Sequence, residues 1–265
     1  MQDRVTLPQW LDNLIFEKLG AKYCRSNADM TVIDWDKNDV LNYLGTYFPR
    51  SYAESYCLFS EFFKNHLEQF VNKAELSIFD FGCGTGGEII GFLTVLDEQL
   101  PNLKKVRIVA LDGNQDALLL YEEIIAAYQR RTRIQIDSIP AHLHIDFYKL
   151  EVLDGIMCEY FDIIISFKAI CEFLTKRQFE ERNAYEHLVR FLLSKLDLNG
   201  FLLLEDVTTF NDTTDEWLPK TMDRGLSAIP CRVVAKNKGY NQSYYITHSH
   251  KQNDISKVAW RIIKR

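Results

Sequence analysis

The feature that most constrains the fold is a glycine-rich turn between two apolar segments. Residues 78–91 read Ile-Phe-Asp-Phe-Gly-Cys-Gly-Thr-Gly-Gly-Glu-Ile-Ile-Gly. Glycine is needed where a backbone turns at positive φ, and where a ligand approaches the main chain so closely that a Cβ would clash. The stretch therefore predicts a strand, a tight turn and a helix, with a nucleotide-like ligand held against bare main chain at the start of that helix.

The spacing of Gly82, Gly84 and Gly87 also satisfies the dinucleotide pattern G-x-G-x-x-G, which alone is a weak signal. Asp80 lies two positions before the first glycine, where its carboxylate would repel a pyrophosphate but would accept hydrogen bonds from an ammonium or from loop N–H groups. Asp112 ends the next apolar run, and its two oxygens can hold both hydroxyls of a ribose. These acids favour a nucleoside ligand that carries a positive charge.

With these residues the chain resembles the class I S-adenosylmethionine-dependent methyltransferases, over roughly residues 76–265. The resemblance implies that the segment from Asp80 to Gly86 wraps the methionine part of the cofactor and that Asp112 holds the ribose. It also implies that Asp146, at the end of the third apolar run (142–145), receives the adenine amino group. Asp137 is a rival for that role, because residues 134–136 also have the pattern of a short strand. The residues expected to contact S-adenosylmethionine are Asp80, Gly82, Cys83, Gly84, Thr85, Asp112, Gly113, Asp146, Phe147, Ser166 and Phe167.

The second part of the chain alternates strand and helix patterns, which predicts an α/β fold with a doubly wound, mostly parallel sheet. Expected strands include 106–111, 161–167 and 201–204, and expected helices include 87–99, 115–130 and 180–195. The stretches 244–249 and 257–264 alternate as an antiparallel hairpin does. This terminal hairpin fits the seven-stranded sheet that the resemblance implies better than a dehydrogenase sheet.

Residues 1–72 show helical patterns but no strand of the βα kind, so we expect a helical N-terminal appendage or lid at 1–72 and the cofactor-binding domain at 73–265. Apolar residues recur at three-to-four spacing from Tyr52 to Val71, as on one face of a long helix. Asp36 or Asn38 is expected to cap the stretch 37–47. Pro49 is expected to separate that stretch from the long helix.

Composition excludes several classes of protein. The 265 residues are 47% hydrophobic, enough to bury a full core, but contain no apolar run of 18 residues and no N-terminal signal pattern. We therefore expect no membrane span and a cytoplasmic location. The six cysteines form no C-x-x-C pair, which argues against a zinc site or a disulfide framework, so no metal is expected. Cys231 follows Pro230, but its position beyond the fifth strand disfavours a role as nucleophile.

The charge distribution is uneven along the chain. The net charge is −6, yet residues 220–265 carry ten lysines and arginines against two acids. Tyrosines at 240, 244 and 245 and Trp260 lie among them. This pattern favours contact with RNA through phosphates and stacked bases, and the alternative is a solvated hairpin whose aromatic side chains pack inward.

Catalytic and substrate contacts are less clearly marked. Methyl transfer from a sulfonium needs mainly alignment, so a strong catalytic signature is not required. Glu172 and Asp206 are candidate general bases, with a helix-start charge and a turn cap as their structural alternatives. Lys168, Arg50 and Tyr52 are candidate substrate contacts near the expected mouth of the site. The segment 166–172 lacks the Asn/Asp-Pro-Pro-Tyr/Phe tetrad of amino methyltransferases that act on adenine and cytosine.

The sequence thus favours a methyltransferase that uses S-adenosylmethionine and acts on RNA or another nucleic acid. Two alternatives stay open. One is methylation of a small molecule, with residues 1–72 closing over a deep pocket. The other is a cofactor-binding assembly factor without catalysis, which would keep its biological role when Asp112 is replaced.

Overall fold

The computed structural model describes residues 4–24, 35–175, 178, 183–212 and 214–265. A nine-stranded sheet has the order β1-β10-β11-β6-β5-β2-β3-β4, with β9 also paired to β11. Its central strands β4, β3, β2, β5 and β6 are mutually parallel, whereas β11 is antiparallel to both β6 and β10. The strands span Arg4–Thr6 (β1), Glu75–Phe81 (β2), Lys105–Asp112 (β3), Gln135–His142 (β4), Phe161–Phe167 (β5), Leu196–Val207 (β6), Arg232–Lys236 (β9), Gln242–His248 (β10) and Lys251–Lys264 (β11).

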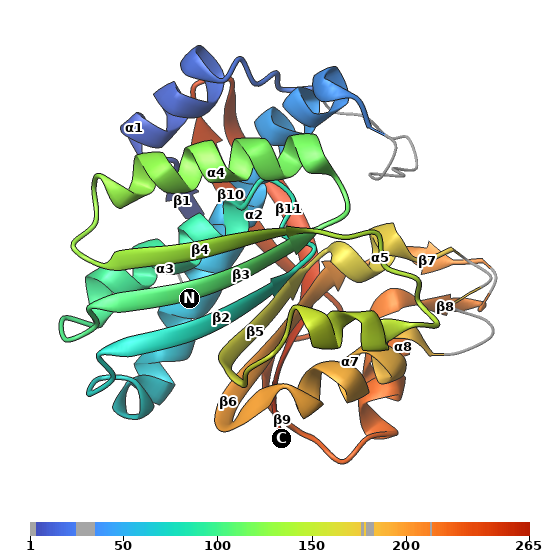
Figure 1. Ribbon diagram of the computed structural model, residues 1–265. Helices are drawn as coiled ribbons and strands as arrows, with labels where there is room; N and C mark the ends of the chain where they lie inside the picture. Colours follow the sequence, from blue (N-terminus) through green and yellow to red (C-terminus); the bar gives the residue numbers. More distant parts are fainter. Residues whose placement is uncertain (1–3, 25–34, 176–177, 179–182, 213) are drawn as a thin grey trace.

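Helices cover both faces of the sheet (Figure 1). One apolar cluster joins α2, α3 and α4 to one face, and a second joins α7 and α8 to the other. In β2, Ile78 belongs to the first cluster and Phe79 to the second, as expected of a central strand buried on both sides. The helices span Gln9–Asp12 (α1), Asn13–Lys18 (η1, a π-helix), Lys37–His66 (α2), Leu67–Gln69 (η3), Gly87–Gln99 (α3), Gln115–Gln129 (α4), Leu150–Gly155 (η4), Ala169–Phe173 (α5), Ala184–Ser194 (α7) and Leu218–Ser227 (α8).

The predicted doubly wound α/β fold is confirmed, including the mostly parallel sheet and the terminal antiparallel hairpin. Seven of the nine strands form the predicted sheet, and β1 and β9 add to it. A separate two-stranded hairpin, β7 (Phe210–Asn211) and β8 (Glu216–Trp217), follows β6. Within the described part of the chain, no helix is long and apolar enough to span a membrane.

Pro49 does not break the chain, contrary to the prediction. It lies inside α2, which runs without interruption from Lys37 to His66. A proline removes one backbone hydrogen bond from a helix, but tertiary packing overrides this local preference where a long helix is buried. The helix is buried along much of its length against α3 and the sheet. The predicted cap is confirmed at Asp36, whose side chain accepts from the backbone N–H groups of Asn38 and Asp39 at 2.7 and 3.0 Å.

The third parallel strand was predicted at 142–145, with 134–136 as the rival stretch. It lies at Gln135–His142, which includes two residues of the rival stretch and only one of the first. This strand, β4, is at the edge of the sheet, where it pairs only with β3 among the described strands. An edge strand tolerates Pro140 and exposes alternate side chains, so its apolar signal is weak. The more apolar stretch that follows β4 is the loop that leaves the sheet.

The N-terminal part is not purely helical, which corrects the expectation for residues 1–72. Strand β1 extends the sheet by pairing parallel to β10, with Val5 opposite Ile246. Arg50 of α2 is also tied to the terminal hairpin, because its guanidinium donates to both carboxylate oxygens of Asp254 at 2.7 and 3.0 Å. The division of the chain at residue 73 stays a prediction.

Candidate functional site

The glycine turn between β2 and α3 is held against the end of β3. The N–H groups of Gly82 and Cys83 both donate to the carbonyl oxygen of Leu111 at 2.9 Å. Gly82 has φ +74°, and a Cβ there would collide with the side chain of Ala169, at the start of α5. Gly84 has φ +49° and faces the Tyr43 ring of α2, which a Cβ would meet at 3.2 Å. The turn therefore has the bare, tightly curved backbone that the sequence predicted.

Asp112 ends β3 beside this turn. Its Oδ2 accepts from the Gly84 N–H at 2.7 Å and its Oδ1 accepts from the Asn114 N–H at 2.8 Å. Burial raises the pKa of the Asp112 carboxyl, and these backbone N–H groups act in the opposite direction. Asn114 in turn caps α4 by accepting from the Ala117 N–H at 3.0 Å. The aspartate is thus oriented by the turn and by the helix start.

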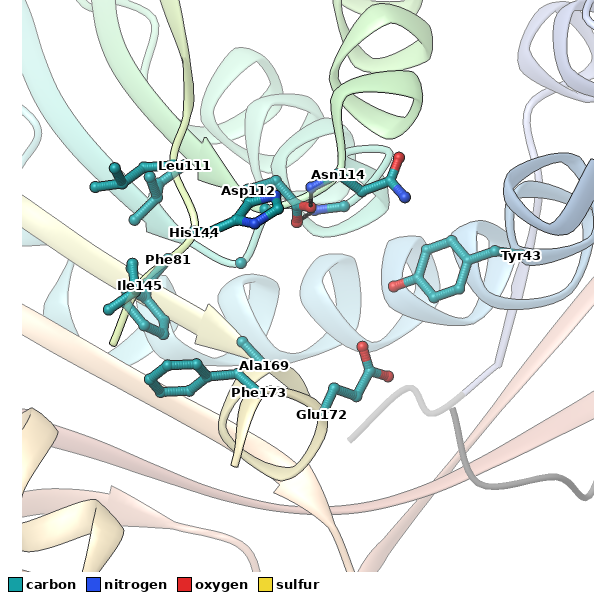
Figure 2. A pocket seen from close by; sticks show the side chains of 14 residues that line it. Tyr43, Phe81, Leu111, Asp112, Asn114, His144, Ile145, Ala169, Glu172 and Phe173 are labelled. Atoms are coloured by element: carbon teal, nitrogen blue, oxygen red, sulfur yellow. Dashed lines mark hydrogen bonds between the residues drawn. The ribbon is translucent and has the colours of Figure 1, made fainter. Parts of the chain in front are cut away.

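A cavity opens at the carboxyl ends of β2, β3 and β5, where open parallel sheets bind ligands. It encloses about 630 Å³ of empty space, part of which is open to solvent. Figure 2 shows Phe81, Leu111, Ile145 and Phe173 on the left, Asp112, Asn114 and His144 near the top centre, Tyr43 on the right and Glu172 at the lower centre. Gly82, Gly84, Gly113, Leu143 and Ala169 complete its lining.

A group of buried acids lies behind the glycine turn. Asp80 and Glu205 are almost fully buried, and none of their carboxylate oxygens has a hydrogen-bond partner among the described residues. Burial and the neighbouring carboxylates of Glu88 and Asp112 raise the pKa of Asp80. Burial also raises the pKa of Glu88 to about 8. Because these acids cannot all ionise in a dry interior, some of them hold a proton at neutral pH.

Lys168, expected to contact substrate, is a buried ion-pair partner instead. Its ammonium donates to Oε2 of Glu54 in α2 at 2.6 Å, and the lysine side chain is 7% exposed. The lysine does not line the cavity, and its positive φ of 56° directs the chain from β5 into α5. The pair links α2 to the end of β5 and offsets part of the negative charge of the buried acids.

The two residues expected to hold adenine lie apart from the cavity lining. Asp146 is exposed, and its side chain accepts from the Tyr148 N–H at 2.9 Å. Asp137 lies near the beginning of β4, opposite Arg107 and away from the carboxyl ends of the strands. Leu143, His144 and Ile145, in the loop after β4, line the cavity instead. The position at which the exposed edge strand β4 ends decides which residues reach the cavity, and the sequence pattern alone does not give that position.

Other predicted residues divide between the cavity and the core. Gly113 lines the cavity, whereas Cys83, Thr85, Ser166 and Phe167 are buried next to it, with the hydroxyls of Thr85 and Ser166 lacking a hydrogen-bond partner among the described residues. Phe147 is buried against Phe173 and His187.

The two candidate bases and the two remaining candidate substrate contacts differ in whether they line the cavity. Glu172 lines the cavity, and burial raises the pKa of its carboxyl to about 8. Asp206 is buried and accepts from the Tyr185 hydroxyl at 2.8 Å. Arg50 is paired with Asp254, and Tyr52 is buried in α2. Of these residues, only Glu172 lines the cavity.

Sequence reasoning missed Tyr43, Asn114 and Phe173 as cavity residues. Asn114 had a readable signal, because it stands at the N-cap of a predicted helix immediately after Asp112-Gly113. Tyr43 had none, because it reaches the turn through the packing of α2 on α3, between segments distant in sequence.

The basic C-terminal segment has fewer free groups than its composition suggested. Tyr244 and Trp260 are buried, and Arg261 donates to both carboxylate oxygens of Asp223 at 2.6 and 2.9 Å. Tyr240 is 40% exposed and donates its hydroxyl to the Thr208 carbonyl at 3.0 Å. The inward-packing alternative is therefore correct for two of the four aromatic residues.

Comparison with known proteins adds only distant likenesses. No protein-family model and no curated protein matches the chain. A solved putative O-methyltransferase from Klebsiella pneumoniae aligns over 98% of this chain and 91% of its own, with 11% identity and a TM-score of 0.47. Coclaurine N-methyltransferase bound to N-methylheliamine and SAH aligns over 100% and 82%, with 12% identity and a TM-score of 0.46. The rRNA methyltransferase aviRa from Streptomyces viridochromogenes aligns over 77% and 82%, with 14% identity and a TM-score of 0.42.

The chain has a class I methyltransferase fold. This statement rests on the parallel core, the glycine turn after β2 and the antiparallel terminal hairpin. The likenesses above all have TM-scores under 0.5 and identities of 14% or less.

Proposed function

We propose that this protein is a methyltransferase that uses S-adenosylmethionine. The observation that carries the proposal is the cavity in which two positive-φ glycines, Gly82 and Gly84, meet the carboxylate of Asp112. Bare main chain accommodates a ligand at contact distance, and a carboxylate at the end of the second parallel strand can accept both hydroxyls of a ribose. A dinucleotide is disfavoured, because none of the described lining residues is a lysine or an arginine that could compensate the charge of a pyrophosphate.

Different lining residues would hold different parts of this cofactor. Phe81, Leu111, Ile145 and Phe173 offer an apolar slot for the adenine ring, and Asp112 offers its two oxygens to the ribose. Bound S-adenosylmethionine supplies an already activated methyl group on a sulfonium, so that the protein has to align the acceptor and exclude water. The acidic surroundings of the glycine turn complement the positive charges of this cofactor.

Calorimetry tests the proposal directly. We expect micromolar binding of S-adenosylmethionine and S-adenosylhomocysteine, and no binding of NAD. Asp112→Ala should weaken binding at least tenfold, since a hydrogen bond to a charged group contributes about 1.5–3 kcal/mol. Asp137→Ala removes an acid from the same sheet outside the cavity and should bind as the wild-type protein does. Wild-type protein that binds neither compound would refute the proposal and leave the fold as a scaffold.

RNA is the acceptor that the basic C-terminal segment suggested. Support for it comes mainly from exposed cations such as Lys236, Lys238 and Lys257. Of the aromatic residues there, Tyr244 and Trp260 are buried and unable to stack on bases, whereas Tyr240 is exposed. Binding through these cations would weaken steeply with added salt. A salt series of RNA binding, with Lys236 and Lys238 both changed to Glu, tests this acceptor. Tight binding that survives in the double variant would count against a role for the basic segment.

A further inference from the structure

Two polar groups from different elements face the cavity, apart from the carboxylate of Asp112. Glu172 comes from α5, which follows β5, and Tyr43 comes from α2. Figure 2 shows the Glu172 carboxylate and the Tyr43 hydroxyl pointing toward the same space. The Tyr43 hydroxyl is close enough to Glu172 for that carboxylate to help raise the tyrosine pKa, after burial. This space is where an acceptor would meet a cofactor seated on the glycine turn and Asp112.

The ionisable side chains around this space are mainly acids, and a bound cation favours their ionised forms. Asp112 and Glu172 line the cavity, and none of the described lining residues is a lysine or an arginine. Lys168, the nearby cation behind the lining, is already paired with Glu54. An anionic acceptor group such as a phosphate would meet repulsion here without compensation, whereas a cation would be attracted. The lining therefore selects against acidic acceptors.

Two aromatic rings pack against Tyr43, which lines the cavity. The Tyr43 ring lies 5.3 Å from the ring of Trp35 and 5.1 Å from that of Tyr47, measured between centroids. Aromatic faces attract ammonium groups, and a carboxylate beside them adds direct charge complementarity. Together with Glu172, the Tyr43 ring gives this side of the cavity the composition of a site for an organic cation.

We propose that the methyl acceptor is an aliphatic amine that enters as an ammonium ion and that Glu172 is the general base that removes its proton. This inference rests on the proposed function above. An ammonium nitrogen has no free lone pair, so one proton must leave before it can attack. The Glu172 carboxylate takes that proton, and the nitrogen lone pair then forms the N–C bond as the C–S bond breaks. The bonding electrons go to sulfur, which becomes a neutral thioether.

The surroundings of Glu172 suit this proton transfer. Burial, together with the carboxylates of Asp206, Asp112 and Glu88, raises the pKa of Glu172 to about 8, and the Lys168 ammonium acts in the opposite direction. A base whose pKa lies close to that of an alkylammonium takes its proton with a smaller free-energy cost than an ordinary carboxylate does. An ammonium bound beside Glu172 also favours the ionised form of the base.

The test uses labelled S-adenosylmethionine and acceptors of defined chemistry. The amine set is benzylamine, spermidine and a lysine-containing peptide. The comparison set is benzyl alcohol, phenol, phenylacetate and a short single-stranded RNA. Transfer is measured with the wild-type protein, with Glu172→Gln, and with Glu151→Gln, which changes an exposed glutamate outside the cavity. Calorimetry with S-adenosylmethionine is run on all three proteins.

We expect label in the amine set only, with kcat/KM rising as pH increases toward about 8, the pKa of Glu172. Glu172→Gln should lower kcat by about 100-fold or more and remove that part of the pH profile, while its cofactor affinity stays within a few-fold of wild type. Glu151→Gln should behave as wild type. Label in RNA, phenol or alcohol, or in no acceptor while the cofactor still binds, would overturn the amine assignment alone. Absence of cofactor binding would instead refute the proposed function.

Discussion

Gly91→Ala should destabilise the protein by separating α2 from α3. The two helices approach each other so closely at Gly91 that an added Cβ would lie 2.5 Å from the Tyr52 carbonyl oxygen and 3.1 Å from the Ser55 Cβ. One turn earlier, a Cβ on Gly87 would lie 2.5 Å from the Phe48 carbonyl oxygen. A backbone oxygen cannot rotate away as a flexible side chain can, so the helices themselves must move.

The expected loss of unfolding free energy in Gly91→Ala is the sum of three contributions. Overpacking in a dense interior costs about 1–3 kcal/mol. Moving α2 also strains or breaks the hydrogen bond from the Ser55 hydroxyl to the Glu88 carbonyl, which is 2.6 Å long, and loss of such a bond costs about 1 kcal/mol. Alanine offsets about 1 kcal/mol through its higher helix propensity. The net loss is about 2 kcal/mol, equivalent to about 4–8 °C in Tm for a domain of this size.

Urea unfolding followed by circular dichroism measures this loss. Gly155→Ala is the matched control, because a Cβ at Gly155 meets no atom within 4 Å, and its stability should stay within about 0.5 kcal/mol of wild type. The midpoint for Gly91→Ala should fall with an unchanged m-value. If Gly91→Ala were as stable as wild type or more stable, the gain in helix propensity would outweigh the steric clash with α2. The close approach of α2 and α3 at Gly91 would then be wrong.

Three further outcomes are expected. Gly84→Ala should abolish binding of S-adenosylmethionine, because φ is +49° there and a Cβ would meet Tyr43 at 3.2 Å. Arg50→Leu should cost about 3–5 kcal/mol of unfolding free energy, because it leaves the Asp254 carboxylate buried without its partner. In the wild-type protein, Glu88 should lower the free energy of unfolding by up to about 1.4 kcal/mol per pH unit as pH rises from the pKa of an unfolded glutamate to about 8, because within that window only the folded state binds the proton. Glu88→Gln should remove this decline.

Each of these outcomes has its own check. Gly239→Ala introduces the same backbone strain at φ +70° in open space, so calorimetry should show loss of binding for Gly84→Ala but not for Gly239→Ala. Urea unfolding should show that the double variant loses less unfolding free energy than Arg50→Leu and Asp254→Leu lose together. Losses that simply add would disprove the coupling between the two residues. Unfolding of Glu88→Gln from pH 5 to pH 8 should give a flatter profile than wild type, and parallel profiles would disprove the raised pKa.

Most of the central sheet was predictable because its signals are local. The strand Phe161–Phe167 and the helix Gly87–Gln99 were found at their exact bounds, since a strand with a nearly continuous apolar run and a helix between glycines and a proline have sharp ends. The weakly patterned edge strand β4 and the long helix α2 were not found correctly. In both, tertiary packing overrode what neighbouring residues indicated.

The candidate site likewise contains residues that the sequence predicted and residues that it did not. The glycine turn and Asp112 were readable because they follow directly from the order strand, turn, helix, strand. The side of the cavity formed by Leu143, His144 and Ile145 was not readable, because these residues reach it in the loop after β4. Lys168 and Arg50 were misleading, because a sequence shows their charges but not the partners, Glu54 and Asp254, that lie more than a hundred residues away.

The sequence by itself therefore determined the class of the fold, the glycine turn and the carboxylate that ends β3, since each depends on short-range backbone conformation and residue type. Only the tertiary structure decided that α2 crosses α3 at Gly91, that Tyr43 lies over the turn, and that Glu172 lines the cavity. It also decided which charges are neutralised by a partner and which acids are buried without one. These properties depend on distances between segments far apart in the chain, and they are fixed when the apolar faces of those segments pack together.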